Sequence, residues 1–439
     1  MRKTLIPALL AGALLVGCGA VPEQTAETVP TETATAVPAE TTDAETTAAK
    51  PSRTTASTMT TAATSTTTTT TTAATTLPPT EAVQMACQPV LEAGTRVTVR
   101  DLITETNVDL AAPDSLVDTT TLGEHTVTVA WTQNGVPGET ALTYLVQDTQ
   151  PPVILNAGAE PYVKVGAAFD IGALVGIGDV YDPTPTLIAE GYIDTAAPGS
   201  YPITVTATDS SGNAVTWDLA VQVVDSVPGY APYSPVTDFA AFAAGAGAGG
   251  RCGIDVSKWQ GNIDFDAVRD AGCSFVLMRI GYGDTGGTAD EWYDENMRKA
   301  TAAGLDVGVY FYSTASTTEA AAAQANWIAD RLGGAALQLP VAFDWESFKN
   351  FQRFGISLRQ LNDIYAAFAD TLAARGYETM LYGSRDYLQK AWEVEGRTVW
   401  LAHYTSQTNY AGPHRLWQAC DNGRIPGISG AVDLNVLYD

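Results

Sequence analysis

In residues 251–439, short apolar runs alternate with longer stretches of helical period. Eight runs have the length of strands: 254–256, 275–280, 307–312, 341–343, 379–382, 399–402, 416–419 and 431–436. Helical patterns fall between the early runs, at 290–303, 317–331 and 357–375, whereas the last runs have no helices or very short ones between them. This alternation predicts a compact, incomplete and flattened β/α barrel of the TIM type. Chemistry in such barrels sits at the carboxyl-terminal ends of the strands.

Residues 87–226 follow the two-residue period of strands instead. Segments 122–130 and 144–148 are similar to segments 198–207 and 219–225, so this region predicts two small all-β sandwiches, at 87–150 and 151–226. The join at 148–154 and the turn at 209–213 resemble those of tandem bacterial immunoglobulin-like modules. These modules either space and present the barrel or bind wall polymer. The first role is favoured because no aromatic cluster marks a sugar site.

Residues 1–18 have the pattern of a targeting segment, in which a charged start precedes an apolar stretch at 5–16 that is too short to span a membrane as a mature helix. The run Leu15-Val16-Gly17-Cys18 resembles the lipobox of bacterial lipoproteins. The resemblance implies cleavage before Cys18, a lipid on its sulfur, and attachment to the outer face of the cell membrane. The alternative is an ordinary secretory signal, and both interpretations predict export.

Two further segments have the composition of linkers. Residues 19–86 are rich in Thr, Ala and Pro and include an unbroken threonine run at 66–72, so they bury too little apolar surface to fold and predict a disordered spacer. Residues 227–250 are rich in Pro, Ala and Gly and predict a second linker, which leaves 251–439 as the domain of the predicted barrel.

The formal net charge of −26 argues against nucleic-acid binding, which needs clustered basic surface. The negative charge is unevenly distributed along the chain. Residues 1–250 carry 7 basic and 26 acidic side chains, and residues 251–439 carry 16 basic and 23 acidic ones. Beyond Cys18 the cysteines are scattered, with no C-x-x-C pair, so neither a zinc nor a redox site is predicted. They are either disulfide-bonded or free thiols: Cys87, Cys252, Cys273 and Cys420. We expect a monomer without metal or cofactor.

The most informative residues follow the fourth apolar run of the barrel. Asp344 and Glu346 stand two positions apart there, and side chains at such spacing on a strand share one face. One interpretation is an ion-paired strand end. The other is glycoside hydrolysis, which needs one protonated and one ionised carboxyl side by side.

Two more acids occupy the first and last strands, as Asp255 and Asp433. These strands are neighbours when a barrel closes, so we expect the two acids to lie together, facing Asp344 and Glu346 across the mouth. Four acids in one place cannot all be ionised cheaply. Repulsion and desolvation therefore raise the pKa of at least one, which becomes a proton donor near neutral pH.

Aromatic side chains gather near the same strand ends. Carboxylates combined with aromatic faces suit a carbohydrate, whose C–H faces pack on rings. The aromatic residues are Trp259, Tyr282, Tyr310, Tyr312, Trp345, Tyr382, Trp400, Tyr404 and Trp417.

Five motifs in a fixed order then suggest a family. They are Asp255-Val256-Ser257-Lys258-Trp259-Gln260-Gly261, Asp344-Trp345-Glu346, Trp400-Leu401-Ala402-His403-Tyr404, Leu416-Trp417-Gln418 and Val432-Asp433-Leu434-Asn435. Together they resemble the glycoside hydrolase family 25 lysozymes over essentially all of residues 252–439. The resemblance implies a muramidase that cuts the β-1,4 bond between N-acetylmuramic acid and N-acetylglucosamine in peptidoglycan.

The resemblance also implies roles for single residues. Glu346 matches the general acid, and Asp344 matches the acid that orients the substrate's N-acetyl group in a substrate-assisted, retaining mechanism. Asp255 and Asp433 match supporting acids. The residues expected to bind substrate are Tyr310, Tyr312, Trp345, Tyr382, Trp400, Tyr404, Trp417 and Gln418. One departure is visible, because many members carry a histidine in the third-strand motif where this chain has Phe311.

Other chemistries fit less well. The barrel region holds two histidines, His403 and His414, and no nucleophilic Ser or Cys motif, and no loop has EF-hand spacing. The main alternative is a non-catalytic surface adhesin or wall-glycan-binding protein. On either interpretation the expected partners are peptidoglycan glycan strands, reached from the outer face of the membrane in or near the cell wall.

Overall fold

The computed structural model describes residues 82–156, 161–229, 231–246 and 249–438. The targeting segment with Cys18 and almost all of the Thr-rich spacer lie outside these residues, so the predictions made for them stay predictions. Among the described residues, no helix is both long and apolar enough to cross a membrane.

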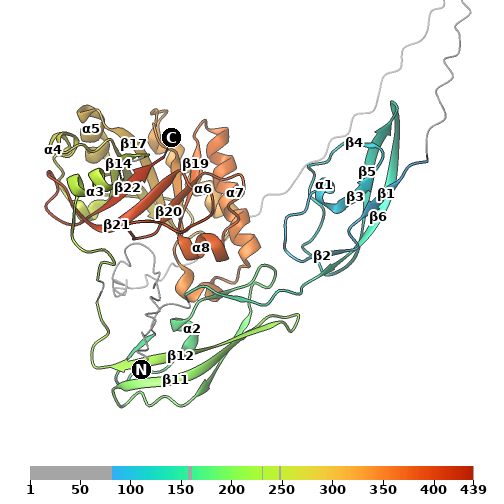
Figure 1. The fold of residues 1–439 in the computed structure, drawn as a ribbon, viewed down its shortest axis with the longest axis horizontal. Coiled ribbons are helices and arrows are strands. Elements are labelled where there is room, and N and C mark those ends of the chain that lie inside the picture. Colours follow the sequence, from blue (N-terminus) through green and yellow to red (C-terminus); the bar gives the residue numbers. More distant parts are fainter. Residues whose placement is uncertain (1–81, 157–160, 230, 247–248, 439) are drawn as a thin grey trace, which may run out of the picture. The chain divides into compact units, whose positions relative to one another are not determined.

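Eight strands form the barrel, as the sequence predicts (Figure 1). They are β14 (Arg251–Val256), β15 (Phe275–Gly283), β17 (Asp306–Ser313), β18 (Val341–Asp344), β19 (Thr379–Ser384), β20 (Val399–Ala402), β21 (Leu416–Arg424) and β22 (Val432–Leu437). Seven run parallel in sequence order, and β22 is antiparallel to both β21 and β14. The ring of strands is therefore closed, and the barrel is incomplete only in its helices.

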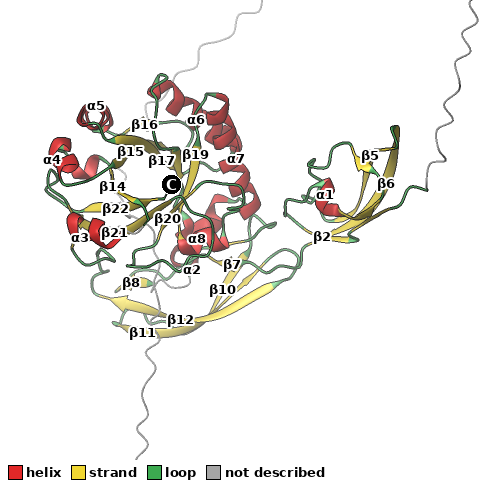
Figure 2. Ribbon diagram, turned by 45° about the horizontal axis from the view of Figure 1, so that its top comes forward, coloured by secondary structure: helices red, strands yellow, loops and turns green. Residues whose placement is uncertain are grey.

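The three predicted helices are present as α5 (Tyr293–Ala303), α6 (Thr318–Leu332) and α7 (Leu358–Ala374), and they lie outside the strands (Figure 2). Capping residues set where α6 and α7 begin, since the Thr317 hydroxyl accepts the Ala320 N–H of α6 and Ser357 forms a capping box with Gln360 of α7. The barrel domain also contains shorter elements: η1 (Lys258–Gln260), α4 (Phe265–Asp270), η2 (Phe348–Phe354), α8 (Arg385–Lys390) and a small hairpin strand β16 (Thr288–Ala289).

The barrel strands bury both of their faces, which is why their sequences read as continuous apolar runs. Outward side chains pack beneath the helices in one large cluster that includes Val276, Phe343 and Leu381. Inward side chains of alternate residues fill the barrel with a second cluster that includes Leu277 and Ala342. This alternation decides which residues reach the mouth of the barrel.

Two β domains precede the barrel, each with a four-stranded and a two-stranded sheet. The first contains β1 (Met85–Cys87), β2 (Val90–Glu92), α1 (Val99–Leu102), β3 (Ile103–Thr106), β4 (Asp109–Leu110), β5 (Gly123–Gln133) and β6 (Val136–Gln147). The second contains β7 (Val153–Ile154), β8 (Tyr162–Lys164), α2 (Ile171–Leu174), β9 (Ile177–Gly178), β10 (Thr186–Gly191), β11 (Gly199–Thr208) and β12 (Ala214–Val224).

The two domains share one strand order. The sheet β2-β6-β5-β4 matches β8-β12-β11-β10, and in both the first strand joins parallel while the others pair antiparallel. This common order accounts for the internal similarity of the sequence. Their likeness to immunoglobulin-like modules stays a prediction, and we call them the first and second β modules.

The prediction of a linker at 227–250 is wrong in part. Strand β13 (Thr237–Asp238) extends the barrel sheet along β21, and α3 (Phe239–Ala246) packs beside it. Phe239 is fully buried in the outer cluster, and the Asp421 carboxylate accepts the N–H groups of Tyr233 and Ser234, each at 2.7 Å. The Ala-rich composition that resembled a linker is that of a short helix.

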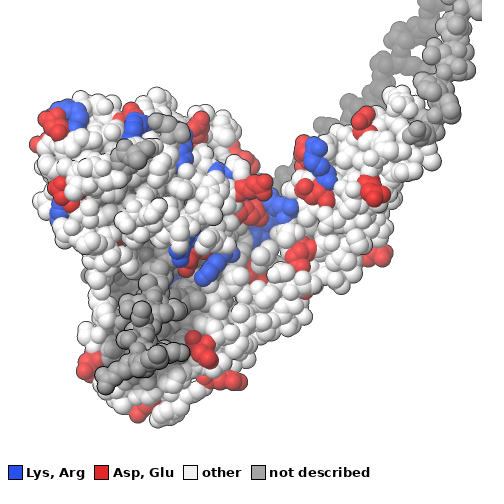
Figure 3. Space-filling view, in the orientation of Figure 1, with Lys and Arg blue, Asp and Glu red and all other residues white. Residues whose placement is uncertain are grey.

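The cysteines and charges add two observations. The four described cysteines are free thiols, and Cys252, Cys273 and Cys420 are buried. Lys and Arg side chains are interspersed with Asp and Glu on the face shown in Figure 3, which does not resemble a nucleic-acid-binding surface.

Replacement of Phe239 tests whether this segment belongs to the barrel. We expect Phe239→Ala to lower the free energy of unfolding by about 3 kcal/mol, because it leaves a cavity in the outer cluster. Val236→Ala is the control, since Val236 is 65% exposed and its truncation should change stability by less than about 0.5 kcal/mol. Denaturant unfolding of both variants measures the difference, and equal stabilities would show that the segment is a linker.

Candidate active site

The four acids predicted from the sequence meet at the mouth of the barrel. Asp255 on β14 and Asp433 on β22 are direct cross-strand partners, and Asp344 ends β18. Glu346 lies close enough to the other three for each of their charges to raise its pKa. Asp255 and Asp344 are each 5% exposed, whereas Glu346 and Asp433 are half-buried and retain access to solvent.

Asp344 and Glu346 form a hydrogen-bonded pair. Burial raises the pKa of Glu346 well above its usual value, and the charge of Asp344 and the hydrogen bond to it raise the pKa further. Burial also raises the pKa of Asp344, but this rise is opposed by the hydrogen bond from Glu346 and by the positive charge of Arg279. The surroundings therefore favour the protonated form of Glu346 more strongly than that of Asp344.

No N–H group of the described residues satisfies the buried oxygen of Asp344. Its Oδ1 atom is buried and has no hydrogen-bond partner among the described residues. A buried carboxylate oxygen left in this state is costly unless a ligand donates to it. The pair thus combines a carboxyl group whose pKa is strongly raised with a carboxylate oxygen that the described N–H groups leave unsatisfied.

Asp255 is held by amide side chains from the last two strands. Its Oδ2 atom accepts Asn435 Nδ2 at 2.7 Å and Gln418 Nε2 at 2.9 Å. Burial raises the pKa of Asp255 to about 6, although these two hydrogen bonds and one with Asp433 act in the opposite direction. Asp255 is thus a poorly solvated charge at neutral pH, fixed in place by its neighbours.

Tyrosines and one tryptophan form a floor beneath the acids. The Tyr382 and Tyr404 hydroxyls both donate to Gln418 Oε1, at 2.9 and 3.0 Å. Trp400 stands edge-on to Tyr310 and Tyr382, with ring centroids 5.9 and 4.7 Å apart. Tyr382, Trp400 and Gln418 are almost fully buried and so support the site from below, whereas Tyr310 and Tyr404 are half-buried.

Tyr312 stands directly beside the acid pair. It is the cross-strand neighbour of Asp344, and its hydroxyl is hydrogen-bonded to Ser347. Burial and the charges of Glu346 and Asp344 raise its pKa, so it remains a neutral phenol. Phe311 points the other way, into the outer cluster, where it packs edge-on to Trp327 at 5.8 Å. The departure at Phe311 therefore removes no group from the mouth.

Two of the expected substrate contacts are wrong. Trp345 and Trp417 belong to the outer cluster, because they occupy the alternate positions to Asp344 and Gln418. Trp345 is fully buried and donates its indole N–H to the Ala315 carbonyl at 3.0 Å, and Trp417 donates to the His403 carbonyl at 2.8 Å. Both support the strands from behind, and neither faces the mouth.

The structure adds three residues to the site. Arg279 on β15 and Asp290 form a buried ion pair of 2.7 Å, and Arg279 lowers the pKa of Asp344. Asn435 lies two residues beyond Asp433 on the same face of β22. The two-residue period of a strand could have predicted Arg279 and Asn435. Arg279 follows the inward-facing Leu277 by two residues, and Asn435 follows Asp433 by two residues.

Two aromatic side chains remain open to solvent near this end of the barrel. Trp259 follows β14 and is 59% exposed, and Tyr282 near the end of β15 is 38% exposed. Each ring lies near a cation, Lys258 and Arg279 respectively. Exposed rings at a rim of this kind suit stacking against a sugar. Within the described part of the chain, no cluster of three or more His, Cys, Asp or Glu side chains is arranged to hold a metal ion.

Comparison with known proteins agrees with this geometry. Residues 254–428 match the model of the glycosyl hydrolases family 25. This part of the chain is therefore similar to the glycosyl hydrolases of that family. The match falls within the barrel and outside both β modules, and it includes every acid described above except Asp433, which lies just beyond its end.

Individual relatives are similar over the same part of the chain. The autolytic lysozyme of Clostridium acetobutylicum is 29% identical over 186 residues, which are 42% of this chain and 54% of that protein. Lysozyme M1 of Streptomyces globisporus is 29% identical over 202 residues, 42% of this chain and 66% of that protein. The chain thus spans about half to two thirds of the length of these curated relatives. A lysozyme structure from Streptomyces coelicolor is 26% identical, covers 43% of this chain and 93% of that chain, and gives a TM-score of 0.37.

The raised pKa of Asp255 leads to a prediction about stability. A buried carboxyl with a raised pKa takes up a proton on folding, so stability falls as pH rises from the usual value of 3.8 to about 6. We expect Asp255→Asn to remove up to about 3 kcal/mol of this decline, because the amide keeps an acceptor for Asn435 and Gln418 without the charge. Denaturant unfolding of both proteins at about pH 4 and about pH 8 measures it. Identical pH dependence of the two proteins would contradict it.

Proposed function

We propose that this protein is a cell-surface lysozyme that hydrolyses the β-1,4 bond between N-acetylmuramic acid and N-acetylglucosamine in peptidoglycan. The pair of Glu346 and Asp344 carries the proposal, because it places a carboxyl group with a strongly raised pKa beside a second carboxyl group that has an unsatisfied oxygen. The family match and the two lysozymes among the relatives support the hydrolysis of a glycosidic bond.

The chemistry follows from the two carboxyl groups. The acetamido N–H of the substrate donates to the Asp344 carboxylate, which orients the acetamido carbonyl oxygen toward the anomeric carbon. That oxygen attacks as the glycosidic bond breaks, and Glu346 transfers its proton to the leaving oxygen. Water then opens the cyclic intermediate while the Glu346 carboxylate takes up the proton, so the configuration is retained.

The other residues of the mouth support this reaction. Asp255 and Asp433 add negative charge, which stabilises the positive charge that develops at the anomeric carbon. Tyr310, Tyr312 and Tyr404 are half-buried at the same end of the strands and provide ring faces and hydroxyls for the sugar. Tyr382, Trp400 and Gln418 lie below them and fix Asp255 rather than contact the sugar directly.

The location of the activity follows from the proposed lipid on Cys18. A lipid-anchored chain with a long spacer places the barrel in or near the cell wall, where its substrate lies. The autolytic relative supports a role in wall turnover or remodelling. We propose that the protein works as a monomer and needs no metal or cofactor, since its two carboxyl groups provide all the proton transfers.

Replacement of Glu346 tests the proposal. We expect the full chain to clear a cell-wall suspension and release new reducing ends, and Glu346→Gln to lower the rate by at least about a thousandfold, because the amide cannot donate a proton to the leaving group. Glu378→Gln is the matched control, since Glu378 is an exposed glutamate that precedes β19 at the opposite end of the strands.

The possible outcomes separate two functions. Lysis by the full chain and by Glu378→Gln, but not by Glu346→Gln, supports the enzyme. Binding of wall fragments by the full chain without release of reducing ends would instead establish a non-catalytic adhesin.

The pKa of Glu346 gives a second prediction. Glu346 must be protonated to act, so we expect the rate to be highest below its raised pKa and to fall as pH rises through it. A titration of kcat from about pH 5 to about pH 9 with soluble peptidoglycan fragments checks this. A flat profile over this range would exclude a carboxyl proton donor.

A further inference from the structure

The second β module packs against the loop that follows the acid pair. Its segment 170–182, which includes α2 and β9, lies against η2 and the start of α7. The approach is closest at Gly176, where a Cβ atom would stand 1.7 Å from the Phe348 carbonyl oxygen. Val153 and Leu155 of the same module pack in the outer cluster of the barrel, and Leu155 is 1% exposed. The start of the second module therefore packs into the outer core of the barrel.

Gln352 of η2 is held entirely by backbone groups of this module. Its Oε1 atom accepts the Ile177 N–H at 3.1 Å. Its Nε2 atom donates to the Gly172 carbonyl at 3.1 Å and the Val175 carbonyl at 3.0 Å. A side-chain amide that satisfies three backbone groups of another domain fixes both its position and its orientation.

The opposite side of η2 holds the acid pair in place. Phe348, Phe351 and Phe354 surround the indole of Trp345, with ring centroids 4.9, 5.7 and 5.1 Å away. Trp345 stands between Asp344 and Glu346 in the sequence, and the Phe348 N–H donates to the Glu346 carbonyl at 2.7 Å. A shift of η2 would therefore move Trp345 and Glu346 with it.

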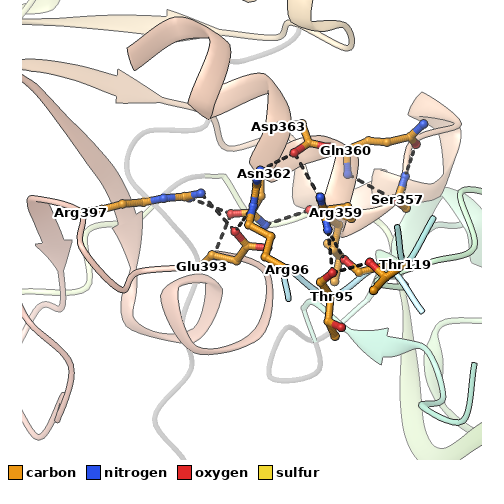
Figure 4. A network of polar contacts seen from close by, with 12 residues as sticks. Thr95, Arg96, Thr119, Ser357, Arg359, Gln360, Asn362, Asp363, Glu393 and Arg397 are labelled. Carbon is orange, nitrogen blue, oxygen red and sulfur yellow. Dashed lines mark hydrogen bonds and ion pairs between the residues drawn. The ribbon is translucent and has the colours of Figure 1, made fainter. Parts of the chain in front are cut away.

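The start of α7 is also held by both modules. The Leu358 N–H donates to the Asp179 carbonyl at 2.7 Å, which satisfies a donor that the helix itself cannot pair. Arg359 donates to the Gly94 and Thr95 carbonyls of the first module, each at 2.9 Å (Figure 4). In the same network Arg96 pairs with Asp363 of α7 and with Glu393.

We propose that the second β module is part of the catalytic apparatus, and that Gln352 is a positioning residue through which the module holds η2 and, with it, Glu346. This inference rests on the proposed lysozyme function. It assigns the module a role beyond spacing, although the module itself lies outside the segment that matches the glycosidase family.

The test compares full-length variants on soluble peptidoglycan fragments. We expect Gln352→Ala to lower kcat about tenfold, with a smaller change in KM, because a misplaced acid affects the chemical step more than binding. We also expect the alkaline limb of its pH profile to move to lower pH, since a looser loop exposes Glu346 to water. Gln389→Ala is the control, because Gln389 is an exposed glutamine of α8 and should match the unmodified protein in both respects.

A second pair of variants introduces a clash instead of removing contacts. Gly176→Ala pushes a methyl group against the Phe348 carbonyl, and Gly229→Ala places the same group in open space. We expect the first to lower kcat and the second to leave it unchanged. Circular dichroism confirms which variants are folded at the assay temperature, and if Gly176→Ala is not folded, Gln352→Ala alone decides.

The outcomes separate this inference from the proposed function. If the unmodified chain does not cleave peptidoglycan, the proposed function fails. If it cleaves, and folded Gln352→Ala keeps the kcat and the pH profile of Gln389→Ala, the inference alone is overturned. A lower melting temperature with unchanged kcat and pH profile would show a structural role only, and it would also overturn the inference.

Discussion

The antiparallel pairing of β22 with β14 is the contact on which the mouth of the barrel depends. Because the last strand runs opposite to its neighbours, its beginning lies beside the carboxyl-terminal ends of the parallel strands. Asp433 is thereby placed opposite Asp255, and Asn435 reaches the Asp255 carboxylate. Without this pairing the ring of strands would be open. Gln418, Asp433 and Asn435 would then no longer lie beside Asp255.

Bringing four acids to one closed end is unfavourable, and the structure reduces this cost in different ways at each acid. Asp255 is stabilised by two amide donors, and Asp344 by the proton of Glu346 and the nearby Arg279. Glu346 has no such donor, so burial and repulsion keep it protonated. The difference between the two members of the pair therefore arises from their surroundings rather than from their chemistry. A site built in this way gives up stability in order to keep one carboxyl group protonated to a higher pH than usual.

The sequence predicted the barrel well because both faces of its strands are buried, so that every strand appears as a short apolar run. It also predicted the meeting of Asp255 and Asp433, because closure of a barrel makes the first and last strands neighbours. It failed for Trp345 and Trp417, since an aromatic residue next to an acid in sequence points to the opposite face of a strand. Composition misled for residues 237–246, because a short Ala-rich helix that packs through Phe239 has the composition of a linker.

The contact between the second β module and η2 was beyond reach for a different reason. It joins residues about 175 positions apart through backbone N–H and carbonyl groups, which leave no signature in side-chain patterns. Gly176 was the only local signal, and a glycine in a β domain has many explanations. This contact argues against dividing the chain into β modules that only present the barrel and a barrel that acts alone. The loop that carries Glu346 is packed on one side by the barrel and on the other by the module, so the geometry of the acid depends on both.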